Sequence, residues 1–373
     1  MAATARRMAR IMAGAARFGV LAFMALPAAA GVRGPAASPA SAAQRMDRYN
    51  TGATHSPQVL RQLAGGTTRG VRAAPLPGAL QGVDVASFQH PNGDSINWTE
   101  VAQAGIQFAA VKATEGAYYK NPYALGDLAQ AKSAGLSVMA YAFAIPNGNG
   151  SSASPTVQAD YLLNYLATAG GTPPTIMLDI EYNPYGAECY GLSKSAMVTW
   201  IAGFNAEIKA RTGQEPIIYT PAAWWQTCTG GVANFRHLPL WVPDYSSATS
   251  PTLPADWTNW GFWQYSSTGT ISGINTPGGT DLDQLNPNRI PLLDPGKQRG
   301  AVGTAVSLQI EPADPVRGQT LTFFATGLPP GLSISASGLI TGTPSTTGRY
   351  SVTVKVTDGH GQSGSVSFHW NVS

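Results

Sequence analysis

Strand-like and helix-like segments alternate along the middle of this chain, from about residue 82 to residue 220. Each short apolar run is followed by a longer stretch that is typical of a helix. The runs are GVDVASFQ (82–89), IQFAAVKAT (106–114), LSVMAYAF (136–143), TIMLDIE (175–181) and PIIYT (216–220). Because a strand–helix–strand connection leaves its two strands parallel, this order predicts a parallel β-sheet with helices packed against it.

The alternation ends after residue 220, where strand-like segments follow one another with little helix between them. These segments are LWVPDY (240–245), GFWQY (261–265) and TDLDQL (280–285). Five strand–helix units followed by three strands predict an α/β fold, an irregular TIM-like (β/α)5β3 barrel. An open doubly wound sheet is the alternative, which we rank lower because no Gly-rich phosphate loop follows the first strand.

Helix ends can be placed in two of the intervening segments. Asn121 is a candidate N-cap with Pro122 at the first helical position, which predicts a helix over 121–135. Ser193 and Gly213 bracket another predicted helix. A third helix is expected over 154–170.

The N-terminal region has the features of an export signal. Four arginines and no acids fall within residues 1–30, together with an apolar run at 18–27 and alanines at 28–30. We therefore expect a signal peptide at 1–30 and a secreted protein, extracellular or associated with the cell wall. Residues 31–80, rich in small residues and proline, predict a disordered linker before a barrel at 81–290.

Charge and cysteine content narrow the possible partners. Without residues 1–30 the chain has 19 basic and 20 acidic residues, so nothing favours binding to nucleic acid or to an anionic membrane. Cys189 and Cys228 can pair in an exported protein, and their spacing matches no zinc motif. We expect a disulfide, no metal, no cofactor and a monomer.

The pattern of strand-like and helix-like segments changes after residues 290–303, where we expect a domain boundary. Residues 304–373 contain short strand-like runs separated by turns, and Tyr350, Val352, Val354 and Val356 alternate strictly. This region predicts a small all-β sandwich. It resembles the immunoglobulin-like modules of secreted bacterial proteins, which implies a spacer or adhesion role.

Two acids lie inside the fourth strand-like run. Asp179 and Glu181 are two residues apart, so they share a face with Met177, opposite Ile176, Leu178 and Ile180. Asp84 and Asp281 occupy other strand-like runs, and the four carboxylates can converge where barrel enzymes hold their active sites. Such acids suit glycoside hydrolysis, although helix capping and calcium binding are alternatives.

Aromatic side chains favour a sugar substrate, because flat rings with polar tips suit the faces and hydroxyls of pyranoses. Core packing is the alternative for each of them, and we assign Trp200 to it. The candidate substrate-binding residues are Tyr141, Phe143, Tyr182, Tyr219, Trp241, Trp263 and Gln264.

These segments together resemble the glycoside hydrolase family 25 lysozymes, which are N-acetylmuramidases. The resemblance runs from residue 82 to about 287 through GVDVASFQ, FAAVKATEG, YAFAIP, MLDIE, IIYT, LWVPDY, FWQYSSTGTISGI and TDLDQL. It implies an irregular barrel of five β/α units and three further strands.

The resemblance also implies roles for the acids. Glu181 would be the general acid, Asp179 would orient the N-acetyl group of the substrate, and Asp84 and Asp281 would complete the acidic site. The implied reaction cleaves β-1,4 bonds between N-acetylmuramic acid and N-acetylglucosamine in peptidoglycan. A chitinase-like N-acetylhexosaminidase and a non-catalytic cell-wall-binding protein are the alternatives.

Overall fold

The computed structural model describes residues 75–147, 150–171, 174–246, 249–255, 257–276, 279–313, 320–359 and 362–373. The expected signal peptide and the linker up to residue 74 lie outside these residues. Residues 75–80, expected as linker, are attached to the barrel. Leu76 N donates to Gln284 Oε1 at 2.7 Å, and Leu80 packs against the core inside the barrel.

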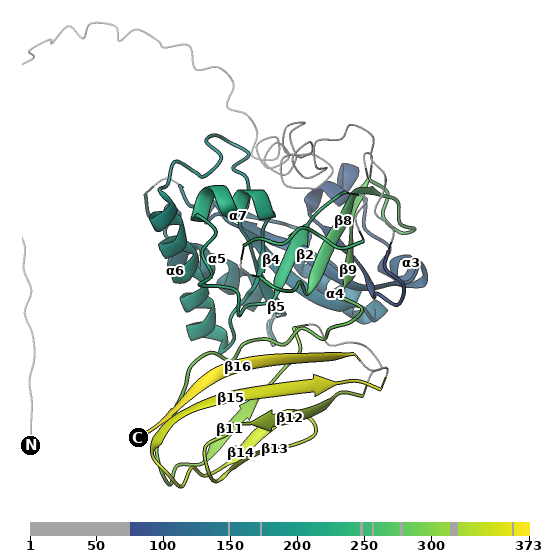
Figure 1. Ribbon diagram of the computed structural model, residues 1–373. Coiled ribbons are helices and arrows are strands. Elements are labelled where there is room, and N and C mark those ends of the chain that lie inside the picture. Colours follow the sequence, from purple (N-terminus) through teal and green to yellow (C-terminus); the bar gives the residue numbers. More distant parts are fainter. Residues whose placement is uncertain are drawn as a thin grey trace, which may run out of the picture. The chain divides into compact units, whose positions relative to one another are not determined.

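Eight strands form a closed barrel, as the sequence predicted (Figure 1). Its strands are β1 (Gln81–Val85), β2 (Ile106–Glu115), β4 (Ser137–Phe143), β5 (Thr175–Asp179), β6 (Ile217–Tyr219), β7 (Leu240–Pro243), β8 (Phe262–Gly269) and β9 (Thr280–Leu285). β3 (Tyr119–Lys120) adds a short hairpin to the end of β2. The sheet closes because β1 pairs with β2 on one side and with β9 on the other.

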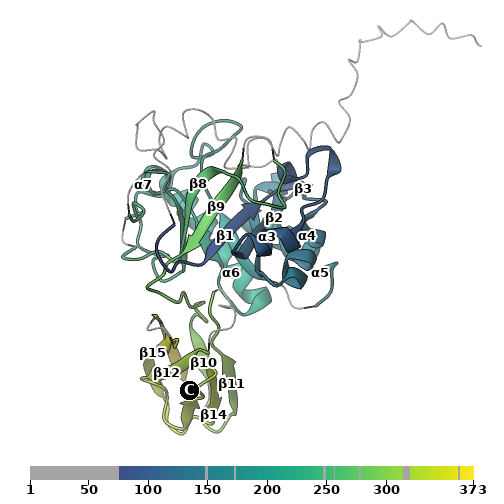
Figure 2. The same cartoon turned by 90° about the vertical axis from the view of Figure 1, so that its right-hand side faces the viewer.

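The first five barrel strands are each followed by a helix, and the described residues after β7 and β8 form none. The α-helices are α3 (Trp98–Gln103), α4 (Ala124–Ala134), α5 (Pro155–Ala167), α6 (Lys194–Thr212) and α7 (Ala222–Thr229). Short 3-10 helices are η2 (Ser87–Gln89), η3 (Pro91–Gly93) and η4 (Gly150–Ala153). Figure 2 shows the helices outside the strands. None of the helices in the described residues is long and apolar enough to span a membrane.

The direction of β9 differs from the expected parallel sheet. β9 runs antiparallel to both of its neighbours, β8 and β1. Its connection from β8 covers only residues 270–279, and such a short connection returns the chain in a hairpin, whereas a parallel strand needs a long crossover. The N-terminal end of β9 therefore lies beside the C-terminal ends of the parallel strands.

The side chains of the strands separate into two packing layers, as alternation predicts. Met177 belongs to the cluster inside the barrel, with Phe108, Met139, Ile217 and Phe262. Ile176, Leu178 and Ile180 belong to the cluster between strands and helices, together with residues of all five α-helices. The strand β5 is thus buried on both faces.

The helix ends agree only in part with the sequence. Ser193 caps α6 by accepting a hydrogen bond from Ala196 N, and Gly213 ends it with a left-handed backbone. Asn121 is not the cap of α4, which begins three residues later at Ala124. Its Oδ1 accepts a hydrogen bond from Tyr123 N directly before the helix, and its Nδ2 donates to the Lys112 carbonyl oxygen, a long-range contact that local sequence does not reveal.

The C-terminal strands form two sheets around one core. One sheet has the order β10 (Gln298–Gly300), β16 (Ser363–Val372), β15 (Gly348–Thr357) and β12 (Thr322–Thr326); the other has β11 (Val306–Gln309), β14 (Leu339–Gly342) and β13 (Leu332–Ile334). Val352, Val354 and Val356 are fully buried, which confirms the predicted alternation. β10 lies within the expected boundary, and Ile290 packs into the core of these sheets.

A disulfide joins Cys189, in the loop after β5, to Cys228 in α7. The bond closes a loop of 39 residues. Replacing both cysteines by serine should lower the free energy of unfolding by about 3–4 kcal/mol, because the unfolded chain regains the entropy of the open loop. Guanidinium unfolding of both proteins measures the difference. Reductant should reproduce the loss in the native protein and leave the variant unchanged; equal stability of the two proteins would contradict the expectation.

Candidate active site

Five carboxyl groups gather at one end of the barrel interior, and we call them the acid cluster. Asp179 is the last residue of β5, and Glu181 lies two residues beyond it. Asp84 of β1 pairs directly with Asp281 of β9, and Asp283 is two residues farther along β9. The four acids singled out in the sequence are thus brought together, and Asp283 joins them.

Glu181 and Asp179 are almost completely buried, with exposed fractions of 4% and 7%. Burial raises the pKa of the Glu181 carboxyl well above its ordinary value, and neighbouring carboxylates raise it further. Burial also raises the pKa of Asp179, whereas the charge of Lys112 lowers the pKa of both groups. The site therefore favours a protonated carboxyl and holds a cationic lysine that acts against this tendency, and a retained proton is what general acid catalysis needs.

Asp84 is held in place by Gln264 of β8. Gln264 Nε2 donates to Asp84 Oδ2 at 2.7 Å, and Gln264 Oε1 accepts hydrogen bonds from the hydroxyls of Tyr219 and Tyr245. Burial raises the pKa of Asp84 to about 6 against the lowering effect of its hydrogen bonds. Gln264 is a predicted substrate-binding residue, and in the structure its amide orients a carboxyl group of the cluster.

Asp283 was not among the sequence-predicted site residues. It is fully buried, and its Oδ1 accepts a hydrogen bond of 2.9 Å from Trp241 Nε1. Burial and the charge of Asp84 raise the pKa of Asp283, and the two carboxyls are also hydrogen-bonded. The sequence offered one indication of it: Asp283 lies two residues after Asp281, so both acids share one face of the strand.

Lys112 and Glu115 of β2 also face the barrel interior, and sequence reasoning missed both. Lys112 Nζ lies 2.7 Å from Glu115 Oε2, and both side chains are completely buried. Residues three apart in a regular strand face opposite sides. The pairing of β2 with β4 shifts between Lys112 and Thr114, and this bulge turns Glu115 to the same face as Lys112.

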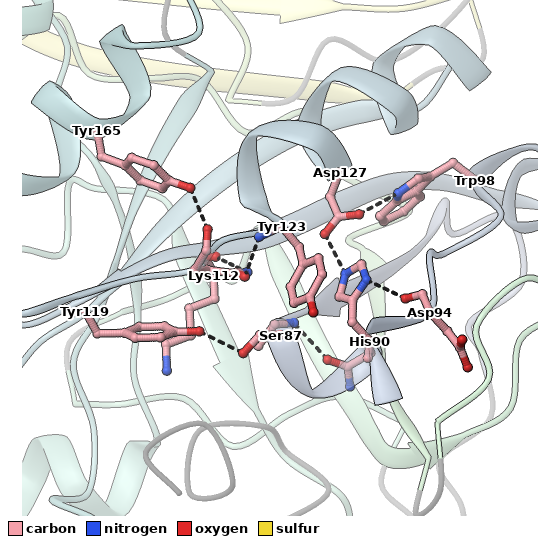
Figure 3. A network of polar contacts seen from close by, with 12 residues as sticks. Ser87, His90, Asp94, Trp98, Lys112, Tyr119, Tyr123, Asp127 and Tyr165 are labelled. Atoms are coloured by element: carbon pink, nitrogen blue, oxygen red, sulfur yellow. Dashed lines mark hydrogen bonds and ion pairs between the residues drawn. The ribbon is translucent and has the colours of Figure 1, made fainter. Parts of the chain in front are cut away.

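Polar contacts support the end of β2 from outside (Figure 3). Asn121 Nδ2 donates to the Lys112 carbonyl oxygen at 2.8 Å, and the Tyr165 hydroxyl donates to the Asn121 carbonyl oxygen at 2.5 Å. The hydroxyls of Ser87 and Tyr119 are 2.7 Å apart, which connects the segment after β1 to β3. The bulge that turns Glu115 toward Lys112 is therefore held by neighbouring loops.

His90 and Asp127 fix the segment after β1 against α4. His90 Nε2 lies 2.9 Å from Asp127 Oδ2, and Trp98 Nε1 donates to Asp127 Oδ1 at 3.1 Å (Figure 3). The His90 ring also stacks on Tyr123. These contacts lie on the helix side of β1, so we assign them the structural role of holding this segment in place.

The predicted sugar-binding residues separate into two groups. Tyr141, Tyr219 and Trp241 belong to the cluster inside the barrel. Phe143 belongs to the cluster between strands and helices, and its ring centroid lies 5.4 Å from Lys112 Nζ. Trp241 is buried beneath the acids and bonds Asp283, so it forms the floor of the site and not its rim.

Tyr182 and Trp263 belong to the outer cluster instead. Trp263 is completely buried there, with Nε1 donating to the Asp244 carbonyl oxygen at 2.7 Å, which corrects our expectation that it contacts substrate. Strand alternation explains the difference, because Phe262 and Gln264 on either side of it face inward.

A group of possible metal ligands lies apart from the acid cluster. His237 Nε2 is 3.4 Å from Glu215 and 3.8 Å from Asp294, and hydrogen bonding to Glu215 raises the pKa of His237. Lys209 is also close, since its charge lowers the pKa of Asp294. The group thus holds two cationic side chains for its two carboxylates, which suits an ion-pair network.

Comparison with known proteins agrees with this geometry. The model of "Glycosyl hydrolases family 25" matches residues 83–274. The chain belongs to this family. A second model, described as "Putative Ig domain", matches residues 286–373.

Individual members of family 25 are similar to the barrel region. Lysozyme M1 of Streptomyces globisporus is 42% identical over 221 residues, 57% of this chain and 70% of that protein. The N,O-diacetylmuramidase of Arthroderma benhamiae is 34% identical over 56% of this chain and 86% of that protein. A solved lysozyme from Streptomyces coelicolor, 42% identical, covers 56% of this chain and 92% of that one, with a TM-score of 0.49.

The acid cluster of this family 25 chain contains groups suited to hydrolysing a glycosidic bond. A protonated carboxyl can donate to the leaving oxygen, and an ionised one can stabilise positive charge that develops on the sugar. Asp179 Oδ1 and Glu181 Oε2 have no hydrogen-bond partner among the described residues. A substrate that contacts these two oxygen atoms therefore displaces no hydrogen bond from the described residues.

Lys112→Met should lower the free energy of unfolding by roughly 3–5 kcal/mol, because it leaves Glu115 as an uncompensated buried charge. The double variant Lys112→Met, Glu115→Gln should be more stable than the single variant, since it contains no such charge. Urea unfolding measures both, with Lys355→Met as the matched control on an exposed strand position. A single variant as stable as this control would contradict the expectation.

Asp281→Asn should lower the pKa of Glu181, because the negative charge of Asp281 raises it in the native protein. A group that must be protonated then loses its proton at lower pH, so the alkaline limb of the pH–activity profile should move down. Carboxyl carbon NMR of Glu181 measures the shift directly. Asp283→Asn is the matched control, because Asp283 is not among the charges that raise this pKa, and an equal shift in both variants would refute the assignment.

Proposed function

We propose that this chain is a secreted muramidase that hydrolyses the β-1,4 bond between N-acetylmuramic acid and N-acetylglucosamine in peptidoglycan. Membership of family 25 and the lysozyme and muramidase relatives support hydrolysis of peptidoglycan. The observation that carries the residue assignment is the buried pair at the end of β5. Glu181 has a raised pKa there and lies beside Asp179.

Glu181 is the proposed general acid. Its proton passes to the glycosidic oxygen as the bond from that oxygen to C1 breaks, and the departing sugar leaves as an alcohol. The raised pKa favours the protonated form that Glu181 needs as the acid, and the carboxylate that remains after the transfer can later accept a proton from water.

Asp179 is proposed to orient the N-acetyl group of the substrate, which then takes part in the reaction. Asp179 ends β5 and Glu181 follows two residues later, so both groups approach the sugar from one side, whereas a direct double displacement uses carboxyls that flank the bond. Asp179 would accept a hydrogen bond from the N-acetyl N–H while the acetyl oxygen attacks C1. Water then attacks C1 and gives its proton to Glu181, which restores the enzyme.

Asp84 and Asp281 are proposed to stabilise the positive charge that develops on the sugar ring. Gln264 keeps the Asp84 carboxyl oriented, and the pairing of β1 with β9 keeps Asp281 beside it. Lys112 limits the rise of the pKa of Asp179, which favours the ionised form that accepts the N–H hydrogen bond.

Export and domain organisation complete the proposal. The disulfide supports an oxidising compartment, and peptidoglycan as substrate supports action outside the cell membrane. We propose that the barrel at 81–290 acts alone as a monomeric enzyme, and that the immunoglobulin-like sheets at 304–373 serve as a spacer or wall-binding module. Their first strand, β10, extends that module to Gln298.

Mass spectrometry of digested peptidoglycan tests the reaction, because it identifies the bond and the sugar together. The products should carry N-acetylmuramic acid at their reducing ends. Glu181→Gln should slow their release by about 10²–10⁴-fold, the usual contribution of a general acid, while circular dichroism remains that of the native protein.

The matched control is Glu188→Gln, an exposed acid in the loop that follows Glu181, which should retain native activity. Products that end in N-acetylglucosamine, or cleavage of chitin oligomers alone, would contradict the muramidase assignment. A Glu181→Gln protein as active as the native one would remove Glu181 as the acid.

A further inference from the structure

Two tyrosines stand out among the large apolar side chains that the described residues leave exposed. Tyr118, in the turn between β2 and β3, is 41% exposed, and Tyr185, in the loop after β5, is 46% exposed. A single exposed aromatic residue is ordinary, but exposed apolar groups that lie together often mark a site that contacts a partner or a ligand. Both loops extend from the end of the barrel that holds the acid cluster.

The hydroxyls of the two tyrosines meet at one buried carboxylate. Tyr118 donates to Glu115 Oε1 at 2.6 Å, and Tyr185 donates to the same oxygen. Glu115 itself is completely buried. Because the polar tips point inward, the exposed parts of both residues are their aromatic rings.

The register of the strands places these rings beside the acid cluster. Glu115 pairs with Phe143 of β4, and Phe143 pairs with Asp179 of β5. Strands lie about 4.8 Å apart, so the backbones of Glu115 and Asp179 are separated by about 10 Å. A glycan strand with one bond at Glu181 can therefore reach the tyrosines with a neighbouring sugar.

Both rings are held rigidly before any ligand arrives. The Tyr118 ring packs over Gly116, where even a Cβ atom would lie 2.6 Å from it. Tyr185 N donates to Asn183 Oδ1 in a tight turn. The same loop is anchored to α7 by the Cys189–Cys228 disulfide and by the hydrogen bond from Trp224 Nε1 to the Glu188 carbonyl oxygen. Ordering these side chains on binding therefore costs little entropy.

We propose that Tyr118 and Tyr185 form a platform that binds a sugar ring of the glycan strand next to the bond that is cut. Recognition is through the ring faces, because the hydroxyls are occupied by Glu115. Glu115 is a positioning residue that holds the two rings together. The proposal rests on the proposed function, since it takes the peptidoglycan glycan as ligand.

The platform is tested by calorimetric titration of the full-length protein carrying Glu181→Gln, which serves as the parent. The ligands are soluble peptidoglycan oligosaccharides that span several sugar positions. Adding Tyr118→Ala or Tyr185→Ala should weaken binding by about three- to tenfold, the usual effect of losing one aromatic contact. Tyr185→Phe should bind within about twofold of the parent, since the ring remains. Phe324→Ala, at an exposed aromatic of β12, is the matched control and should bind like the parent.

The same alanine changes in the active enzyme should raise KM and leave kcat within about twofold, because the rings do not touch the reacting atoms. Unchanged binding in both alanine variants would overturn the platform. Equal losses for Tyr185→Phe and Tyr185→Ala, or a fall in kcat at constant KM, would overturn it in favour of a structural role through Glu115. If the parent binds no oligosaccharide and the native enzyme releases no fragments, the proposed function itself fails.

Discussion

The antiparallel pairing of β1 with β9 is the contact on which the site depends. It closes the barrel and places Asp84 directly opposite Asp281, two acids that are far apart in the sequence. On its other side β1 packs tightly against β2: a Cβ atom at Gly82 would lie 2.1 Å from the Phe108 ring, so the absence of a side chain lets Phe108 fill the interior. Because β9 runs backwards, Asp281 near its start reaches the edge where the parallel strands end.

Closing the barrel around five carboxyls has an electrostatic cost. Burial raises the pKa of four of these acids, so the folded protein binds protons more tightly than the unfolded chain does; the four are Asp84, Asp179, Glu181 and Asp283. For Asp84, with a folded pKa of about 6, the stability of the fold decreases as the pH rises from about 4 through 6. The charge of Lys112 lowers the pKa of Asp179 and Glu181 and so offsets part of this cost. The same burial favours the protonated carboxyl that glycoside hydrolysis requires.

Much of the fold followed from local patterns. The run TIMLDIE is buried on both faces and carries two acids at its end, and its alternation correctly separated Met177 from Ile176 and Leu178. The order of strands and helices likewise predicted five β/α units and three further strands. Such patterns are readable because each depends on neighbours within a few residues.

Other features required contacts between distant segments. Lys112 and Glu115 share a face only because β2 bulges against β4, and Asn121 near the start of α4 also donates to the distant Lys112 carbonyl oxygen. Trp263 resembled a sugar-binding aromatic in sequence, yet its neighbours Phe262 and Gln264 face the interior, which turns it outward. The sequence by itself determined which strands carry acids and which faces are apolar, because alternation is local. Tertiary structure alone decided which acids meet and which lysine accompanies them, because register, strand direction and bulges depend on how the whole sheet closes.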